Sequence, residues 1–227
     1  RNCQLFTVEG NVYRLTEDGR KAVPSAYHLL SEAQNWACGQ PSTRPTMQRY
    51  AHFGAINDYT YLEQKGLNDV FVSDSSFMKD CLLSWLRFDG KLEDLEKLRV
   101  FSMVFRSDAN GWLIVEVGPK SSSAEWFGWK WQKSCLGQRV QNLPASDRLA
   151  PISNSAFDSI TVSQSARLDH ICTQFPRHDS QLPVPISYKR LMLATYFANG
   201  DQALLSVVER THAIRIENLP DNLRPAM

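Results

Sequence analysis

The sequence lacks the features that mark several large classes of protein. Its 227 residues contain no apolar run near the roughly 18 residues that a membrane-spanning helix needs. The five cysteines are scattered, with no C-x-x-C pair, and no N-x-S/T sequon occurs. A scattered, odd set of cysteines is atypical of a disulfide-rich secreted domain. We therefore expect reduced, buried thiols and a cytoplasmic location.

The signature motifs of common enzymes are also absent. The chain holds no G-x-G-x-x-G, no Walker A sequence, no H-E-x-x-H and no G-x-S-x-G. These absences argue against the commonest nucleotide-binding, zinc-protease and α/β-hydrolase classes. The chain also has no excess of charge of either sign, because it contains 25 Lys and Arg and 24 Asp and Glu, for a formal net charge of +1. The overall charge therefore does not attract nucleic acid or an anionic membrane, although it leaves room for a local patch of positive charge.

The strongest strand and hairpin signals lie between Arg99 and Cys135. This stretch also holds four of the six tryptophans. Residues 100–106 are apolar on both faces near their middle, which predicts a buried strand. Asn110-Gly111 follows and is the strongest short hairpin signal in a sequence. Residues 112–117 then predict the returning strand.

Residues 125–132 continue the β-like pattern. The rings of Phe127, Trp129 and Trp131 fall on every second position, which is the spacing of one face of a strand. We therefore expect a third strand here, and with it a three-stranded antiparallel meander over residues 99–132.

Helical periodicity appears in other segments, most clearly at residues 74–87 after the capping signal Ser73-Asp74. Its apolar side consists of Phe77, Met78, Cys81, Leu82, Trp85 and Leu86. Further helices are predicted over residues 25–37, 46–56, 58–64, 92–98, 163–175 and 187–198. Hairpins are predicted near residues 4–15 and 203–217, with a helix over 202–210 as the alternative for the second, and short strands at 70–72 and 156–162.

The string VYRLTEDGRKAV, residues 12–23, resembles the last strand and the following helix of winged-helix regulators, over about 20 residues. The two helices that precede such a wing are not found in the chain before it. A hairpin that packs on a neighbouring helix is the interpretation we favour.

Together these elements predict an α+β fold. Its antiparallel sheet combines the central meander, about 99–132, with the hairpins near 4–15 and 203–217, and amphipathic helices, chiefly 74–87 and 187–198, cover it. The longest irregular segment, residues 142–155, predicts an internal boundary. We expect an N-terminal α+β part, 1–142, and a C-terminal α+β part, 143–227, as two domains or as parts of one.

The aromatic stretch is the first candidate for function. If its rings are buried, they form the core of a sheet; if they are exposed, they offer a stacking platform with lysines nearby. Alternation leaves Trp126 and Lys130 on the face opposite Trp129 and Trp131. We therefore predict a binding surface that consists of Trp126, Lys130, Lys120 and Lys133.

A metal-dependent nuclease is the second candidate, because such sites place an acid before a hairpin and an E-x-K pair on its second strand. Glu116 lies on the predicted second strand, with Asp89 or Asp108 upstream. However, Glu116 and Lys120 are separated by Val-Gly-Pro, so the E-x-K spacing is missing. The sequence predicts no metal site and no cofactor here.

A third candidate is Asp169-His170-Ile-Cys172, since these residue types bind zinc. On a helix over 163–175, His170 and Cys172 would point about 200° apart and could not share one ion. His170 could instead act as the base for the distant Cys135. A buried thiol and a surface histidine are the simpler interpretation.

These patterns favour a non-catalytic binding or regulatory module that engages a macromolecular partner. A protein partner is favoured over nucleic acid because the net charge is close to zero. The alternative is a metal-dependent nuclease or another hydrolase with its site near the central hairpin.

Overall fold

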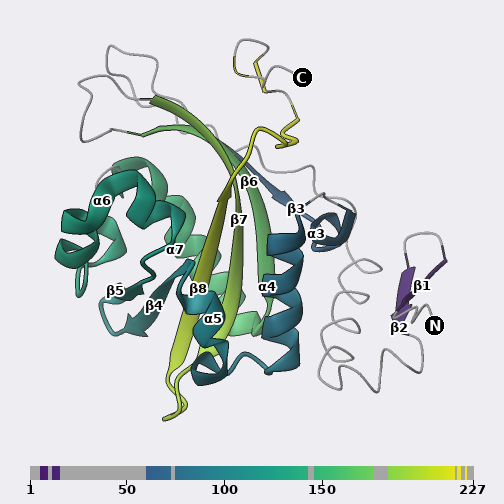
Figure 1. Ribbon diagram of the computed structural model, residues 1–227, viewed down its shortest axis with the longest axis horizontal. Helices are drawn as coiled ribbons and strands as arrows, with labels where there is room; N and C mark the ends of the chain where they lie inside the picture. The colour runs from purple at the N-terminus through teal and green to yellow at the C-terminus, as the bar shows by residue number, and fades with distance from the viewer. Residues whose placement is uncertain are drawn as a thin grey trace.

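The computed structural model describes residues 6–9, 12–15, 60–72, 75–142, 146–175, 184–217, 219, 220 and 223. Within it, a six-stranded sheet has the order β3-β6-β7-β8-β4-β5 (Figure 1). Its strands are β3 (Thr60–Lys65), β4 (Ser102–Asp108), β5 (Gly111–Val117), β6 (Ala166–Phe175), β7 (Val184–Tyr196) and β8 (Gln202–Arg210). Every neighbouring pair is antiparallel, so the predicted α+β class is confirmed.

One face of the sheet is covered by α3 (Asn68–Val72), α4 (Ser76–Arg87), a 3-10 turn at Leu92–Leu95 and α5 (Glu96–Arg99). The N-cap of α4 is Ser75, whose Oγ accepts a hydrogen bond from the Met78 N–H at 3.2 Å. The buried side of α4 consists of Met78, Cys81, Leu82 and Trp85. Burial of Met78 or Leu82 contributes about 1.5–3 kcal/mol for each side chain. The helix predicted at 74–87 is confirmed over Ser76–Arg87, although its cap is Ser75 rather than Ser73-Asp74, and the helix predicted at 92–98 is confirmed with a 3-10 first turn.

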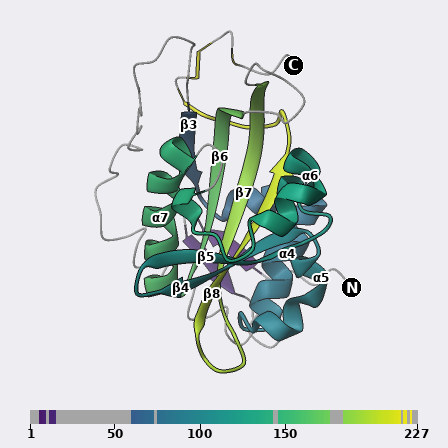
Figure 2. The same ribbon diagram turned by 90° about the vertical axis from the view of Figure 1, so that its left-hand side faces the viewer.

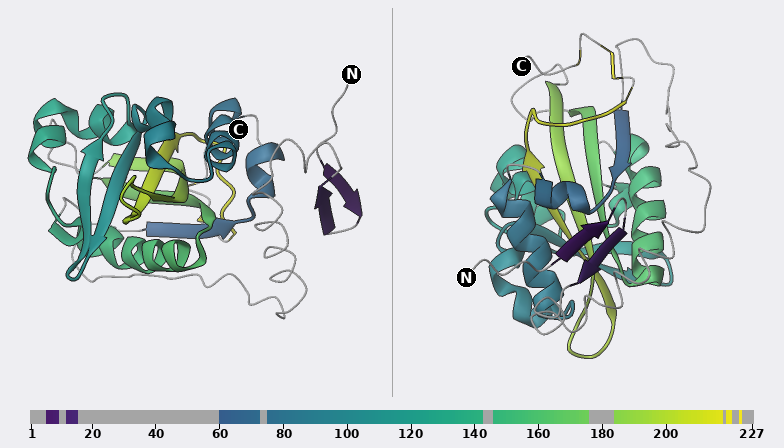
Figure 3. Two further views of the ribbon diagram at one scale, coloured as in Figure 1. Left: turned by 90° about the horizontal axis from the view of Figure 1, so that it is seen from below. Right: turned by 90° about the vertical axis from the view of Figure 1, so that its right-hand side faces the viewer.

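The other face is covered by α6 (Ser122–Ser134), a short 3-10 turn and α7 (Ser146–Ser163). Alternation along the strands separates the two cores: Val104 packs with α4, whereas its neighbours Met103 and Phe105 pack beneath α7. The Phe157 ring of α7 lies 4.8 Å from Phe105 by ring centroids. The result is a helix–sheet–helix sandwich (Figures 2 and 3).

Two predicted hairpins are confirmed. β4 and β5 pair across the turn Ala109-Asn110, and Gly111 is the first residue of β5, opposite Asp108. Near the N-terminus, β1 (Phe6–Glu9) pairs with β2 (Val12–Leu15), as expected for the hairpin near 4–15. The helices predicted at 25–37 and 46–56, and the segment that follows Leu15 in the resemblance to winged-helix proteins, lie outside the described residues.

Several predicted elements are wrong in type. Residues 125–132 belong to helix α6, so the meander lacks its third strand, and β4–β5 form an edge of the sheet rather than its centre. Of the helix predicted at 58–64, the described residues 60–64 fall on β3, and residues 70–72, predicted as a strand, fall on α3. Helices were expected where β6 and β7 run, and α7 replaces both the irregular segment from Ser146 onward and the strand at 156–162. The first strand of the hairpin predicted near 203–217 is confirmed as β8, but it pairs with β7 and β4, and residues 213–217 form no strand.

The reason for the errors at β6 and β7 lies in their position in the middle of the sheet. Leu191, Met192, Leu193 and Ala194 are all at most 3% exposed, because helices cover both faces of β7. A strand buried on both faces has no alternation of polar and apolar residues. Its Leu, Met and Ala then favour a helix when only the local sequence is considered. In the part of the chain that the structure describes, no helix combines the length and apolarity needed to cross a bilayer.

Candidate partner-binding surface

Helix α6 carries three of the four predicted binding residues, and its start is tied to the sheet. The Ser121 side chain caps the helix by accepting the Ala124 N–H at 3.2 Å. The Ser122 Oγ–H donates to the Val208 carbonyl of β8 at 2.7 Å. Four residues after Ala124, Gly128 breaks the helix with φ 82° and ψ 168°. The first turns of α6 are therefore fixed on β8, and its second half runs in a different direction.

Lys120, the fourth predicted residue, precedes α6 in a segment that runs along the start of β4. The Gly118 N–H donates to the Ser102 carbonyl at 2.8 Å, and the Lys120 N–H donates to the Val100 carbonyl at 2.9 Å. A Cβ at position 118 would lie 2.1 Å from the Arg99 carbonyl oxygen, so this approach requires glycine. It places the Lys120 ammonium 5.8 Å from the centroid of the Phe101 ring.

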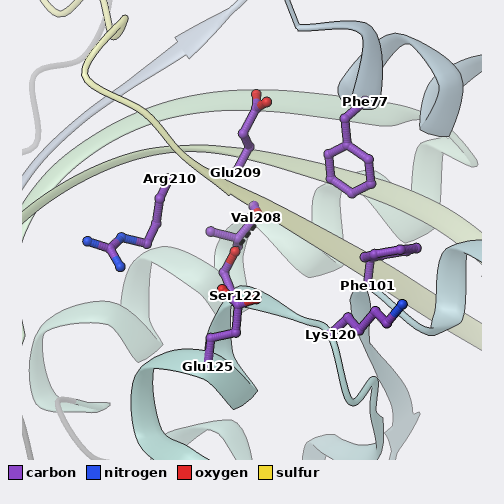
Figure 4. Close-up of a pocket in the computed structure, with 8 residues that line it drawn as sticks. All are labelled: Phe77, Phe101, Lys120, Ser122, Glu125, Val208, Glu209 and Arg210. Carbon is purple, nitrogen blue, oxygen red and sulfur yellow. Dashed lines mark hydrogen bonds between the residues drawn. The ribbon is translucent and has the colours of Figure 1, made fainter.

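An open pocket of about 350 Å³ lies between α4 and α6 (Figure 4). Its location follows from the strand register: β8 pairs with β4 only as far as Val207 opposite Ser102, so the last residues of β8 extend beyond that pairing. The residues that line the pocket are Phe77, Phe101, Lys120, Ser122, Glu125, Val208, Glu209 and Arg210.

The lining combines an apolar wall with charges of both signs. The rings of Phe77 and Phe101 meet edge to face, 5.5 Å apart. Lys120 and Arg210 supply two positive charges, and Glu125 and Glu209 supply two negative charges. Such a lining complements a partner that itself carries mixed charges and an apolar group.

Two tryptophans of α6, Trp126 and Trp129, differ in how far they are exposed. Trp126 is partly buried against the apolar cluster of Ile171, Ile186 and Tyr188, and the Arg210 guanidinium lies 4.9 Å above its ring. Trp129 lies beyond the break at Gly128 and is 63% exposed, with the Lys133 ammonium 5.1 Å from its ring. Lys130 is also exposed. The expectation that Trp126 and Lys130 share an exposed face rests on a strand that does not exist.

The structure does not bring the residues of the nuclease alternative together. Glu116 binds Arg99, whose Nε lies 2.9 Å from its Oε2. Asp108 binds both terminal nitrogens of Arg139 at 2.9 and 3.0 Å, and this pairing, with the Asn110 N–H, lowers the pKa of the carboxyl group. Within the described residues, no group of three or more His, Cys, Asp or Glu side chains is placed to hold a metal ion.

The described thiols are not activated nucleophiles. Burial raises the pKa of Cys81 to about 12 and that of Cys135 to about 11, and it also raises the pKa of Cys172. Cys135 packs in the core beneath α7, whereas His170 points to the other side of the sheet, toward β3 residue Glu63. The pairing of His170 with Cys135 therefore does not occur.

Asp169 has a structural role that the sequence pattern did not suggest. Because residues 166–175 form a strand, Asp169 and His170 point to opposite faces. The Asp169 carboxylate is fully buried and accepts hydrogen bonds from Arg190 at 2.8 Å and from Arg167 at 2.7 Å. Arg190 also donates to the Ser153 hydroxyl of α7 at 2.9 Å. This buried network fastens α7 to the sheet.

Comparisons with known proteins leave the chain without an assigned family, since no family model and no curated protein matches it. It is similar to the solved structure of Vibrio cholera VqmA in complex with ligand and DNA, at 13% identity and a TM-score of 0.39, over 56% of this chain and 53% of that one. It is also similar to an RNA-binding light-oxygen-voltage receptor, at 13% identity and a TM-score of 0.36, over 69% of this chain and 40% of that one. The chain thus spans about half the length of the proteins it matches.

Proposed function

We propose that this chain is a non-catalytic binding module that engages a protein partner through its α6 surface. We define the α6 surface as the pocket between α4 and α6 together with Trp126, Trp129, Lys130 and Lys133. The observation that carries the proposal is the exposed ring of Trp129 on the same helix that forms one wall of the pocket. It supports a regulatory role through association rather than turnover.

The exposure of Trp129 supports an interface because a large aromatic ring gains free energy by leaving water. Trp129 is 63% exposed. Removing that area from water would contribute about 3 kcal/mol, at roughly 25 cal/mol per Å². Tryptophan and arginine are also the residues that most often dominate binding energy at protein interfaces. Arg210, stacked on Trp126 at the edge of the pocket, supplies the second such residue.

The charges of the pocket favour a protein over nucleic acid. Binding to phosphates requires a surplus of positive charge. Here Glu125 and Glu209 offset Lys120 and Arg210, so a phosphate chain that follows the two basic residues would also meet two carboxylates. A peptide with both charge types and an apolar side chain meets no such penalty.

A photo-crosslinking experiment tests the proposal by trapping whatever molecule lies against α6. A benzophenone side chain replaces exposed Lys130, beside Trp129, in the full chain within its own cells. A matched probe replaces Val162, which is 85% exposed at the end of α7. We expect covalent protein adducts from position 130 and far fewer from position 162. Adducts with nucleic acid, or equal yields at the two positions, would contradict the proposal.

Two further substitutions, combined with the probe at position 130, identify the residues that hold the partner. Trp129→Ala should weaken association by about 2 kcal/mol, or roughly 30-fold, if Trp129 is a dominant contact. Lys120→Glu should weaken it further by disturbing the pocket charges. Adduct yields that are unchanged in both variants would show that the partner does not bind through the α6 surface.

A further inference from the structure

A second feature is the segment after β8, which crosses toward β3 on the face of the sheet that α4 covers (Figure 3). Residues Thr211–Glu217 form no strand, yet side chains of the sheet hold two of their backbone amides. The Arg215 N–H donates to His170 Nδ1 at 2.9 Å, and the Glu217 N–H donates to Glu63 Oε2 at 2.6 Å.

The two acceptors form a matched pair. Glu63 of β3 and His170 of β6 are direct cross-strand partners, so their side chains lie next to each other on one face. The amides that they bind belong to residues 215 and 217, and an extended chain presents every second amide to the same side. The two side chains therefore bind alternate amides of the segment, as the carbonyl groups of a neighbouring strand would.

The hydrogen bond from Arg215 defines the protonation state of His170. A backbone N–H is always a donor, so Nδ1 must be its acceptor, and the imidazole is neutral with its proton on Nε2. The Arg215 carbonyl oxygen also lies 3.2 Å from Nδ1, but Nδ1 cannot donate to it while it accepts the N–H. Uptake of a proton at Nδ1 would place two donors against each other.

The surroundings of His170 oppose that proton. His170 is only 4% exposed, and this burial lowers the pKa of its imidazole. The Arg215 carbonyl raises the pKa, Lys189 of β7 and Lys65 of β3 lower it, and Asp69 of α3 raises it. The net direction is downward. Glu63, the cross-strand neighbour of His170, is paired with Lys65.

We propose that Glu63 and His170 form a proton-controlled latch, which holds residues 211–217 against the sheet at neutral pH and releases them when His170 is protonated. In the released state His170 is exposed, and its pKa returns toward the usual value of about 6.5. A group whose pKa is lowered in the docked state strengthens docking fully above about pH 6.5. That contribution is lost as the pH falls through the lower pKa of the docked state. The latch thus links acidification to the position of the C-terminal segment.

Hydrogen–deuterium exchange of the full chain between pH 7.5 and pH 5 tests the latch. Protection of each amide is expressed relative to an unstructured peptide at the same pH, which removes the intrinsic pH dependence of exchange. We expect the amides of residues 215 and 217 to lose protection below about pH 6.5, by at most about tenfold per pH unit, because one proton is linked. Amides at the centre of β7 should stay protected. Constant protection at 215 and 217, or a parallel loss in β7, would overturn the proposal.

Two variants separate His170 from the neighbouring carboxylate. His170→Gln supplies an oxygen acceptor that does not titrate in this range, so protection should no longer depend on pH. Glu63→Gln keeps an acceptor oxygen but removes the carboxylate, and the response of the native chain should persist. The opposite pattern would show that Glu63 is the sensor and would refute the role given to His170. If His170→Gln does not fold, nitrogen NMR of the native His170 ring decides the matter, because a proton on Nδ1 at pH 7.5 contradicts the latch.

Discussion

Gly128 offers the sharpest test of how α6 presents Trp129. Its φ of 82° and ψ of 168° lie in a region that is essentially restricted to glycine. A side chain in that region costs about 1–3 kcal/mol, and alanine regains about 0.4–1 kcal/mol by restricting the unfolded chain. A Cβ at this position would meet nothing within 4 Å, so no collision adds to the cost. Gly128→Ala should therefore lower the free energy of unfolding by about 1–2 kcal/mol.

The variant can escape this cost only by forming a continuous helix. In a continuous helix, Trp126 and Trp129 would lie about 60° apart around the axis. Trp129 would then turn toward the side that packs on the sheet, and its exposure would fall.

Urea unfolding followed by circular dichroism measures the stability, and the rate of oxidation of Trp129 measures its exposure. Lys130→Ala serves as the control, because Lys130 is exposed on the same helix, and we expect it to change stability by less than about 0.5 kcal/mol. A Gly128→Ala variant that is as stable as the native chain and oxidises Trp129 at the native rate would refute the account of α6.

Three further predictions concern the core and the pocket wall. Arg190→Met leaves the buried Asp169 with one partner and should cost about 3–5 kcal/mol in urea unfolding; a loss below about 1 kcal/mol would contradict the bridging role. Gly118→Ala should displace the segment that carries the pocket lysine, because its Cβ would meet a carbonyl oxygen at 2.1 Å, and a crystal structure with that segment unmoved would disprove this. Cys81 and Cys135 should resist thiol labelling at pH 8 until the chain unfolds, because their raised pKa values of about 12 and 11 leave at most about one thiol in a thousand ionised. Peptide mapping measures the labelling, and labelling of either thiol in the folded chain would contradict this prediction.

The sequence allowed prediction of those elements whose signals are local. Asn110-Gly111 specifies a tight turn by its backbone preferences, and the apolar spacing of residues 74–87 specifies an amphipathic helix, whatever surrounds them. Both elements are present. Their positions within the sheet were not predictable, because the order of the strands depends on contacts between distant segments.

Helix α7 shows why polar composition misled the prediction. Its serines and Pro151 are typical of a loop. In the structure two of the hydroxyl groups are satisfied within the helix: Thr161 donates to the Phe157 carbonyl at 2.7 Å, and Ser163 donates to the Ser159 carbonyl at 2.8 Å. The apolar residues Phe157 and Ile160 then anchor the helix on the core.

The proposed α6 surface was predictable only in part. Lys120, Trp126, Lys130 and Lys133 were proposed as binding residues because they cluster in the sequence, and three of them lie on α6. Trp129 was assigned to the buried side because alternate residues of a strand share a face, whereas the break at Gly128 exposes it. The other walls of the pocket come chiefly from α4 and β8, which are distant from α6 in the sequence, and no local signal links them to it.

The most direct measurement of the central claim is hydroxyl-radical footprinting of Trp129 in cell extract and in the purified chain. Trp129 should be oxidised rapidly when purified and should be protected in extract, and the protection should survive treatment of the extract with nuclease. Val162, which is 85% exposed on α7, should be oxidised equally in both. Equal oxidation of Trp129 in both samples, or protection that nuclease removes, would contradict a protein partner at the α6 surface.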